Sequence, residues 1–298
     1  MAKITFMGAG STVFAKNVLG DCLATPALAG GDIALYDIDP VRLKDSQMML
    51  ENLKATAGAT ATIRSCTRES RREALRGADF VVNAIQVGGY EPCTVTDFVV
   101  PKKYGLRQTI ADTLGIGGIF RALRTIPVML EFAREMEEVC PEALFLNYTN
   151  PMAMVTAAFL RGSGIRAVGL CHSVQVCAEW LVKGVGMAWD PRTLAKIAGI
   201  NHQGWLLEIS LDGKDLYPQI KRRSAAGQVP GTDRVRHELM RRFGYHVTES
   251  SEHSAEYAPW FIKGTHPELI ERFNLFSAGP HLDISPQNSP HRLGHSRS

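Results

Sequence analysis

The feature that most constrains this sequence is a glycine turn near its start, placed between an apolar run and a helical segment. The residues Gly8-Ala9-Gly10-Ser11-Thr12-Val13 follow the buried-strand pattern Ile4–Met7 and open a segment with helical spacing, Thr12–Leu23. Gly8 permits a tight turn, and Gly10 lets the backbone approach a pyrophosphate. The helix N-terminus then supplies N–H donors and a positive dipole to the anion. This strand–turn–helix unit predicts a dinucleotide-binding fold.

A carboxylate after the next strand indicates which dinucleotide is bound. Asp37 follows the expected strand Ile33–Tyr36 and lies 27 residues after Gly10. It suits a ribose diol and repels a 2′-phosphate, which favours NAD over NADP. Ser11 adds a hydroxyl donor, whereas Val13 replaces the third glycine of the usual fingerprint. The alternative is a plain glycine turn with a helix-capping Asp, but the strand–turn–helix context favours the cofactor site.

Apolar runs continue to alternate with helical segments through the first half of the chain. This alternation predicts an α/β fold with a Rossmann-like, doubly wound parallel sheet of the lactate and malate dehydrogenase type. The later expected helices include one interrupted by Pro127. The remaining expected strands and helices are Thr62–Cys66, Phe80–Ile85, Leu144–Leu146, Ala167–Leu170, Pro40–Ala55 and Ile119–Val139.

The pattern changes after about residue 190. Ile197–Ile200 and Trp205–Leu211 are expected strands, Asp212-Gly213 is a turn signal, and Asp233–Phe243 is an expected helix. We therefore expect an NAD-binding domain at 1–190 and a smaller, incomplete α+β domain at 191–273. Residues 274–298 are rich in Pro, Ser and His and poor in large apolar side chains. Such a segment cannot bury enough surface to offset its ordering entropy, and we expect a disordered tail.

Composition excludes several classes of partner. The net charge of +3 is spread along the chain, which argues against nucleic acid and membrane surfaces. Apolar stretches such as Phe80–Ile85 are too short to cross a bilayer. The N-terminus enters a strand directly, without the pattern of a secretory signal. We therefore expect a cytoplasmic protein whose six cysteines are thiols.

A Cys and a His follow two expected strands in the second half. Cys171-His172-Ser173 begins a helix, where a thiolate is stabilised, and Asn201-His202 ends a short strand about thirty residues later. Two such residues can converge on one metal and leave coordination positions for substrate oxygens. A buried cysteine and a core histidine are the commoner outcome, and the spacing leaves both readings open.

Other polar segments have two readings as well. Asn150 is expected to cap a helix that has Pro151 at its first position, or to contact a sugar hydroxyl. Thr248–Tyr257, followed by Trp260 and Phe261, is either a carbohydrate site or a solvated loop. The loop 111–118 is either an anion or sugar site or a flexible connection.

Together these segments resemble glycoside hydrolase family 4, and within it the bacterial α-galactosidases. The family also holds α-glucosidases, α-glucuronidases and phospho-glycosidases. The resemblance spans residues 3 to about 273. The segments that carry it are Gly8–Thr12, Asp37–Pro40, Gly88–Asp97, Thr109–Gly118, Arg121–Pro127, Asn147–Met154, Gly169–Gln175, Gly199–His202 and Val247–Lys263.

The resemblance implies a hydrolase that uses NAD and a divalent metal, typically Mn²⁺, instead of two carboxylates. Hydride leaves C3 of the sugar for NAD⁺, and the metal polarises the resulting ketone. A base then removes the acidified C2 proton, the aglycone is eliminated, water adds, and the hydride returns. The implied substrate is a small α-galactoside, and the longer family members are implied to form homo-oligomers.

The resemblance also assigns roles to individual residues. The implied metal ligands are Cys171 and His202, the C2 base is Tyr257, the acid for the leaving group is His172, and the substrate contact is Asn150. Gly8, Gly10, Ser11 and Asp37 match the NAD site. A tyrosine base needs its pKa of about 10 lowered, which a nearby Mn²⁺ achieves.

Two further readings stay open at this point. Family members run beyond the end of this chain, so it resembles a truncated or frame-shifted product with exposed apolar surface, and a non-catalytic NAD-binding remnant is one alternative. The other is a plain NAD-linked dehydrogenase of a hydroxy-acid, which shares the fold and the glycine turn.

Overall fold

The computed structural model describes residues 1–110, 113 and 115–275 and contains two compact units. The first comprises Met1–Gly89 and Arg121–Leu170, and the second comprises Tyr90–Phe120 and the chain from Cys171 on. These units differ from the predicted domains, which placed one boundary at 190. The predicted tail at 274–298 lies outside the described residues from 276 on.

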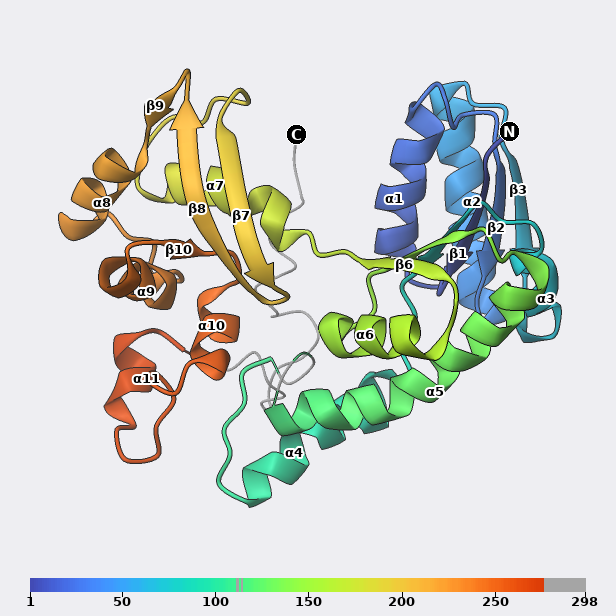
Figure 1. Ribbon diagram of the computed structural model, residues 1–298. Helices are drawn as coiled ribbons and strands as arrows, with labels where there is room; N and C mark the ends of the chain where they lie inside the picture. The colour runs from blue at the N-terminus through green and yellow to red at the C-terminus, as the bar shows by residue number, and fades with distance from the viewer. Residues whose placement is uncertain (111–112, 114, 276–298) are drawn as a thin grey trace. The chain divides into compact units, whose positions relative to one another are not determined.

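The first unit is built on a six-stranded sheet whose neighbouring strands are all parallel (Figure 1). The strand order β3-β2-β1-β4-β5-β6 is that of a doubly wound dinucleotide-binding fold, as predicted. Since parallel strands end at the same edge, the loops after them gather there. The strands are β1 (Lys3–Met7), β2 (Asp32–Tyr36), β3 (Thr62–Cys66), β4 (Phe80–Asn83), β5 (Leu144–Asn147) and β6 (Arg166–Gly169).

Helices cover both faces of this sheet because successive strand side chains point to opposite sides. Phe6 and Leu35 pack with Leu19 and Leu50 of α1 and α2 on one face. The helices of the first unit are α1 (Thr12–Ala24), α2 (Pro40–Ala57), α3 (Arg71–Leu75), α5 (Gly115–Val139, which begins in the second unit) and α6 (Met152–Gly162), with a short 3₁₀ turn η1 (Arg68–Ser70).

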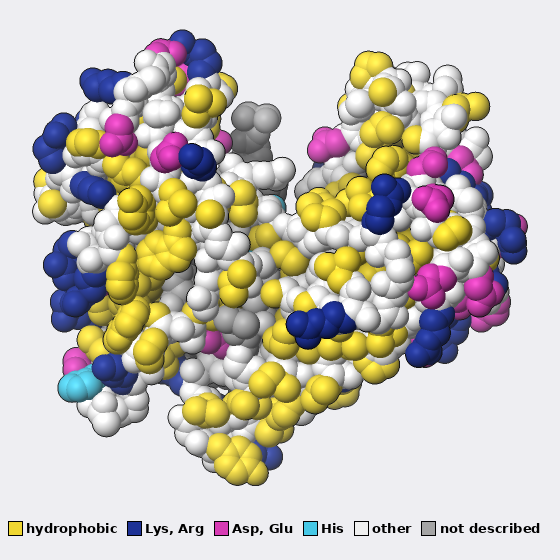
Figure 2. Space-filling view, viewed as in Figure 1, with side chains coloured by type: hydrophobic (Ala, Val, Ile, Leu, Met, Phe, Trp, Pro, Cys, Tyr) yellow, Lys and Arg dark blue, Asp and Glu magenta, His cyan; other side chains and the backbone are white. Residues whose placement is uncertain are grey.

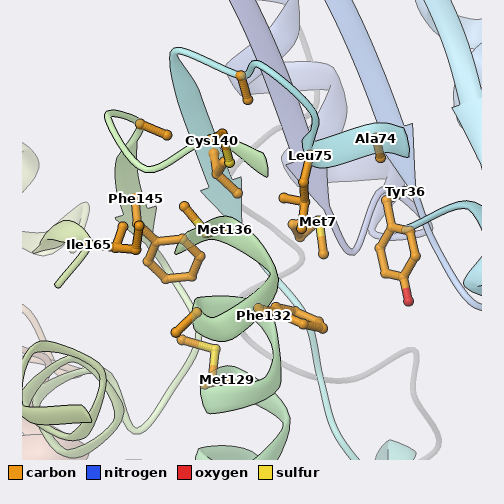
Figure 3. Close-up of a cluster of buried hydrophobic side chains, with 14 of the residues drawn as sticks. Met7, Tyr36, Ala74, Leu75, Met129, Phe132, Met136, Cys140, Phe145 and Ile165 are labelled. Atoms are coloured by element: carbon orange, nitrogen blue, oxygen red, sulfur yellow. The ribbon is translucent and has the colours of Figure 1, made fainter. Parts of the chain in front are cut away.

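On the other face the core is made by α3, α5 and α6 (Figure 3). Met7 and Tyr36 lie beside Phe132 of α5, and Phe145 stacks on Phe159 of α6 with ring centroids 4.2 Å apart. Helix α5 starts four residues before the predicted Ile119 and continues through its internal proline. Fully buried aromatic and aliphatic side chains on both faces hold the carboxyl edge of the sheet in place.

The second unit contains an antiparallel sheet in the order β10-β8-β7, with β9 paired to β8. Helix α7 packs on β8 through Cys177 and Leu181, and it therefore belongs to the second unit, which resumes at Cys171. The elements are β7 (Leu194–Ile200), β8 (Gln203–Leu211), β9 (Lys214–Asp215), β10 (His246–Val247), a π-helical turn η2 (Gly89–Thr94), α4 (Val95–Lys103), α7 (Ser173–Gly184), α8 (Tyr217–Ala225), α9 (Arg234–Phe243), α10 (Ser251–Tyr257) and α11 (Glu268–Arg272).

The second unit has a tight hairpin turn and exposed aromatic side chains. Asp212 and Gly213 both have positive φ, as the predicted hairpin turn between β8 and β9 requires. Phe243 and Trp260 of the second unit are each about half exposed, and hydrophobic side chains are visible among basic ones on the surface of this unit (Figure 2). No helix in the described part of the chain is long and apolar enough to cross a membrane.

Candidate functional site

The glycine turn after β1 is shaped by its backbone. Gly8 has φ +86°, and a Cβ at this position would lie 2.7 Å from the carbonyl oxygen of Ala84. The amides of Gly8 and Ala9 both donate to the Tyr36 carbonyl at 2.9 Å, which pins the turn to β2. Only glycine meets both conditions at position 8, since the space and the dihedral exclude a side chain. The turn is therefore packed closely against the end of β4.

Asp37 organises this turn from the end of β2. Its Oδ2 accepts a hydrogen bond from the Gly10 amide at 2.6 Å, and its Oδ1 accepts one from the Asp39 amide at 2.9 Å. The alternative role of helix cap belongs to Asp39, whose side chain accepts from the amides of Val41 and Arg42. Asp37 is thus fixed at the mouth of the turn by backbone groups.

A pocket of about 760 Å³ lies beside the turn in the first unit. It is lined by Gly8 and Asp37, by the segment 85–88 after β4, and by Arg68 and Arg71. Ser11 is the N-cap residue of α1, and its hydroxyl makes no capping hydrogen bond. Val13 is 68% exposed, so the replaced third glycine faces solvent rather than a packed strand. The turn, the pocket and the helix N-terminus together fit a dinucleotide.

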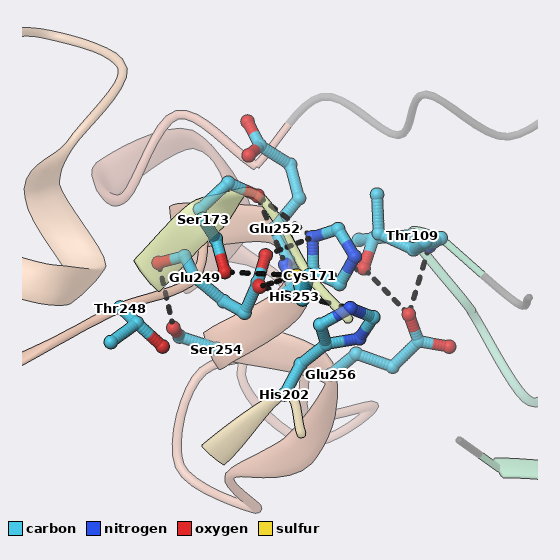
Figure 4. Close-up of polar contacts among 12 residues, drawn as sticks. Thr109, Cys171, Ser173, His202, Thr248, Glu249, Glu252, His253, Ser254 and Glu256 are labelled. Carbon is cyan, nitrogen blue, oxygen red and sulfur yellow. Dashed lines mark hydrogen bonds and ion pairs between the residues drawn. The ribbon is translucent and has the colours of Figure 1, made fainter. Parts of the chain in front are cut away.

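A second cluster of functional groups lies in the second unit (Figure 4). One ligand atom from each of Cys171, His202 and Glu249 lies within 4.8 Å of the others. The Cys171 Sγ lies 3.4 Å from Glu249 Oε1, and His202 Nε2 lies 3.7 Å from the same oxygen. His202 and Glu249 are buried, and Cys171 is half-buried. A thiol, an imidazole and a carboxylate that converge in this way fit a divalent transition metal.

Each of the three groups stands where a strand ends. Cys171 lies between β6 and α7, His202 lies in the turn between β7 and β8, and Glu249 lies between β10 and α10. The sequence indicated the first two by their positions after strands. It missed Glu249 as a ligand, although the polar run 248–257 contains it, because nothing in one sequence tells which of several acids faces inward.

Neighbouring side chains set the charge of this cluster. Burial, and then Glu249, raise the pKa of the Cys171 thiol, although Ser173 Oγ at 3.1 Å opposes this. The Ser173 backbone at the start of α7 lowers the pKa of this thiol, as expected at a helix N-terminus, but burial outweighs it. Burial alone would raise the pKa of Glu249, but His202 and His253, together with hydrogen bonds from Ser173 and Cys171, lower it.

The two residues expected to move protons lie near this cluster along the chain. Tyr257 ends α10, and its hydroxyl is 3.2 Å from His202 Nδ1. His172 is the N-cap residue of α7 and is exposed. The ring of His253 lies against His202 at 5.0 Å and Tyr257 at 6.0 Å between centroids. Tyr257 therefore adjoins a cluster residue through a direct contact.

Asn150 belongs to the first unit, in the loop after β5. Helix α6 begins at Met152 with Pro151 as its N-cap residue, one position later than predicted. Asn150 Oδ1 nevertheless accepts from the Met152 amide at 3.3 Å, so it still satisfies one helix N–H. A buried amide network, in which Asn83 donates to Asn147 Oδ1 at 2.9 Å, supports this loop.

The loop before α5 is tied to α10. Thr109 donates through its hydroxyl to the Glu252 carbonyl at 2.8 Å and to Glu256 Oε2 at 3.0 Å. The Ile110 amide donates to the same oxygen at 2.8 Å. These bonds show why residues 90–120 group with the second unit. The expected anion or sugar site at 111–118 includes residues 111, 112 and 114, which lie outside the described part.

Two family models match the chain in succession. The model of family 4 glycosyl hydrolases matches residues 3–187, and that of the C-terminal domain of the same family matches residues 197–286. The chain belongs to glycosyl hydrolase family 4. The second match extends past residue 273, where we expected the family pattern to end.

Individual family 4 proteins are similar over most of this chain. An α-galactosidase of Bacillus subtilis is 61% identical over 92% of the chain and 63% of its own length. An α-galactosidase of Rhizobium meliloti is 35% identical over 91% of the chain and 55% of its own length. This family 4 chain therefore spans less than two thirds of either relative.

Solved structures confirm the predicted fold. A 6-phospho-α-glucosidase from gut microorganisms, in complex with NAD and Mn²⁺, is 20% identical and has a TM-score of 0.71 over 91% of this chain and 66% of its own. The apo malate dehydrogenase of Picrophilus torridus is 18% identical, with a TM-score of 0.59 over 86% of this family 4 chain and 74% of its own. The Rossmann-like architecture is common to all three.

Proposed function

We propose that this family 4 chain carries the machinery for NAD- and Mn²⁺-dependent hydrolysis of α-galactosides. The observation that carries the proposal is the convergence of Cys171, His202 and Glu249, with the Tyr257 hydroxyl 3.2 Å from His202. The 61% identity to an α-galactosidase supports the substrate, because relatives near 31% identity include α-galacturonidases and an α-glucosidase. We further propose a cytoplasmic location, where thiols such as Cys171 stay reduced.

The first unit would bind the cofactor. The free N–H groups at the start of α1 would face the pyrophosphate, Ser11 would add its hydroxyl, and Asp37 would accept from the ribose hydroxyls. The positive φ of Gly8 and the absence of a side chain at Gly10 let the turn pack against Ala84 and Asp37. Asn150 would contact a sugar hydroxyl through its amide.

The second unit would hold the cation and move the protons. Bound NAD⁺ supplies a reversible hydride acceptor for the sugar C3, and a bound divalent cation supplies positive charge beside the oxygen at C3. Cys171 and His202 would hold that cation. Tyr257 would take the C2 proton onto its phenolate oxygen, and His172 would donate a proton to the leaving oxygen. His202, which contacts Tyr257, would link the metal site to the base.

The first test is hydrolysis of a chromogenic α-galactoside by the purified 298-residue chain. NAD⁺, Mn²⁺ and a thiol reductant are each omitted in turn, and absorbance at 340 nm is followed in parallel. Hydrolysis that needs all three, with no net NADH, is the expected result. Oxidation of a hydroxy-acid with net NADH and no metal requirement would favour the dehydrogenase. Soluble protein that binds NAD without any turnover would favour the non-catalytic remnant.

A further inference from the structure

We propose that Glu249 is a third protein donor to the cation, beside Cys171 and His202. This inference rests on the proposed function, because it takes a divalent cation to be bound in the second unit. It adds a hard oxygen ligand to the thiolate and imidazole. The site would then hold its cation through three side chains before any substrate arrives.

The distances match those that a shared cation requires. Donors that lie about 2.0–2.3 Å from one metal ion stand roughly 3.0–4.4 Å from each other. Glu249 Oε1 is 3.4 Å from Cys171 Sγ and 3.7 Å from His202 Nε2. A single carboxylate oxygen therefore faces both other donors at ligand spacing. No other group of three or more His, Cys, Asp or Glu side chains reaches this spacing among the described residues.

Glu249 is a buried carboxylate that faces the other donor groups of the cluster. It is 6% exposed, so its carboxylate is removed from water. The Cys171 thiol donates a hydrogen bond to Glu249 Oε1 at 3.4 Å, and His202 Nε2 and His253 Nδ1 lie 3.7 and 3.8 Å from the carboxylate oxygens. A buried charge is tolerated where it is paired or coordinates a metal. A divalent cation that replaces the thiol proton would be held by the sulfur and the carboxylate oxygen together.

The scaffold fixes the backbone that carries Glu249. The Arg236 guanidinium, 4% exposed, donates to the Val247 carbonyl at 2.9 and 3.1 Å and to the Thr248 carbonyl at 3.3 Å. The Thr248 amide donates to the Gly204 carbonyl at 3.0 Å, which joins this segment to β8. Charge-assisted bonds from a buried arginine hold a segment firmly. Glu249 is thus presented by a rigid support rather than by a mobile loop.

The nearby acid Glu252 provides a matched comparison. It lies in α10, three residues after Glu249, and its side chain belongs to no ligand cluster among the described residues. Figure 4 shows the side chains of both acids together with Cys171 and His202. Neutralising either acid changes the net charge equally, so a difference between them reports position rather than charge.

The test is a titration of the metal-free 298-residue chain with Mn²⁺, followed by the electron paramagnetic resonance signal of free Mn²⁺, without NAD or sugar. Glu249→Gln, Glu249→Asp, Glu252→Gln and Cys171→Ser are compared with the original chain. Loss of even a supporting group around a metal costs about 10- to 100-fold in affinity. We expect Glu249→Gln to lose at least that much, Glu249→Asp to lie between it and the original, and Glu252→Gln to stay within about twofold.

Titration with a second cation distinguishes whether Glu249 is a metal ligand or a carboxylate with only a structural role. Removal of a hard oxygen donor weakens Mn²⁺ more than the softer Cd²⁺, which Cys171 and His202 retain. We therefore expect Glu249→Gln to lower the ratio of Mn²⁺ to Cd²⁺ affinity by about tenfold, whereas a structural defect would lower both equally.

The outcomes are distinguishable. If Glu249→Gln binds Mn²⁺ as the original chain does while Cys171→Ser does not, the inference is wrong and the proposed metal site stands. Equal losses for Mn²⁺ and Cd²⁺ would also overturn the inference. If the original chain binds no Mn²⁺, both the metal part of the proposed function and the inference fail. If circular dichroism shows that the glutamine variant is unfolded, the aspartate variant decides, and unchanged affinity in it overturns the inference.

Discussion

The two units of this chain build their sites from different parts of the polypeptide. In the first unit the candidate site is mainly backbone: a turn at Gly8, the N-terminus of α1, and a carboxylate that binds the turn itself. In the second unit the site is made of side chains, and Cys171, His202 and Glu249 reach one point from the ends of three different strands.

The backbone site and the side-chain site therefore give different signals in a sequence. A backbone site needs a local run of residues, because turn, glycine and helix start are consecutive. A side-chain site needs only that separate segments fold to the same place, and 78 residues separate Cys171 from Glu249. Added side-chain atoms should impair the backbone site, whereas the loss of ligand atoms should impair the side-chain site. The predictions below test this contrast.

The largest expected effect is at the proposed metal site. Cys171→Ser should abolish Mn²⁺ dependence and lower α-galactoside hydrolysis by at least about 10³-fold, because the cation supplies several kcal/mol of charge stabilisation. Metal content and initial rates check this. Cys93→Ser, also in the second unit, is the control. Unchanged activity and metal content in Cys171→Ser would remove this residue from the site.

Tyr257→Phe removes the hydroxyl 3.2 Å from His202 and leaves the ring. If Tyr257 is the base, the rate should fall by about 10²-fold or more, with Mn²⁺ affinity kept. Exchange of the C2 proton for solvent deuterium, measured by NMR, isolates the proton-transfer step. An unchanged exchange rate would rule Tyr257 out as the base.

In the first unit, an added methyl group should lower both the stability of the fold and the affinity for NAD. Gly8→Ala places a Cβ 2.7 Å from the Ala84 carbonyl at φ +86°. We expect a loss of about 1–3 kcal/mol in unfolding free energy and at least tenfold weaker NAD binding, roughly 1.4 kcal/mol. Gly77→Ala is a matched control, since Gly77 has φ +64° but open space around it. Equal NAD affinities in both variants would refute the role of the Gly8 turn.

Asp37→Ala should weaken NAD binding by about tenfold, because it removes both the ribose acceptor and the bond to the Gly10 amide. Isothermal titration calorimetry measures the dissociation constant. Asp39→Ala removes the cap of α2 and should lower stability by about 1 kcal/mol without changing NAD affinity. NAD affinity that is unaffected in Asp37→Ala would argue against the ribose assignment.

The smallest effect concerns pH. Burial, with Arg236 and His237, lowers the pKa of His246, which is fully buried, with Asp233 Oδ2 4.0 Å away. Since the unfolded histidine titrates near 6.5, the unfolded chain binds the extra proton below that pH. Stability should therefore be complete above about pH 6.5 and fall as pH drops, by up to about 1.4 kcal/mol per pH unit.

His246→Phe should make this acid slope shallower in urea unfolding between pH 7.5 and 5. His266→Asn, at a histidine whose side chain is 57% exposed, should leave the slope unchanged. His237 has a lowered pKa as well, chiefly through burial, and it accounts for the slope that should remain. Identical slopes in the His246 variant and the original chain would contradict the prediction.

Much of the fold could be predicted from the sequence. The strand Thr62–Cys66 has the predicted bounds, and β1 and β2 begin one residue before the predicted ones. Short apolar runs bounded by glycine and helical segments leave few alternatives to buried parallel strands. Local signals failed at the start of α6, where Pro151 is the cap residue.

The sequence by itself determined the parallel sheet, the glycine turn and the position of Asp37, because each depends on residues adjacent in the chain. It also indicated Cys171 and His202, since both follow strands. Only the tertiary structure decided that Glu249 faces them, because the polar run 248–257 contains three acids. Which acid points inward depends on how Arg236 and β8 hold the backbone before α10, and those contacts join residues far apart in sequence.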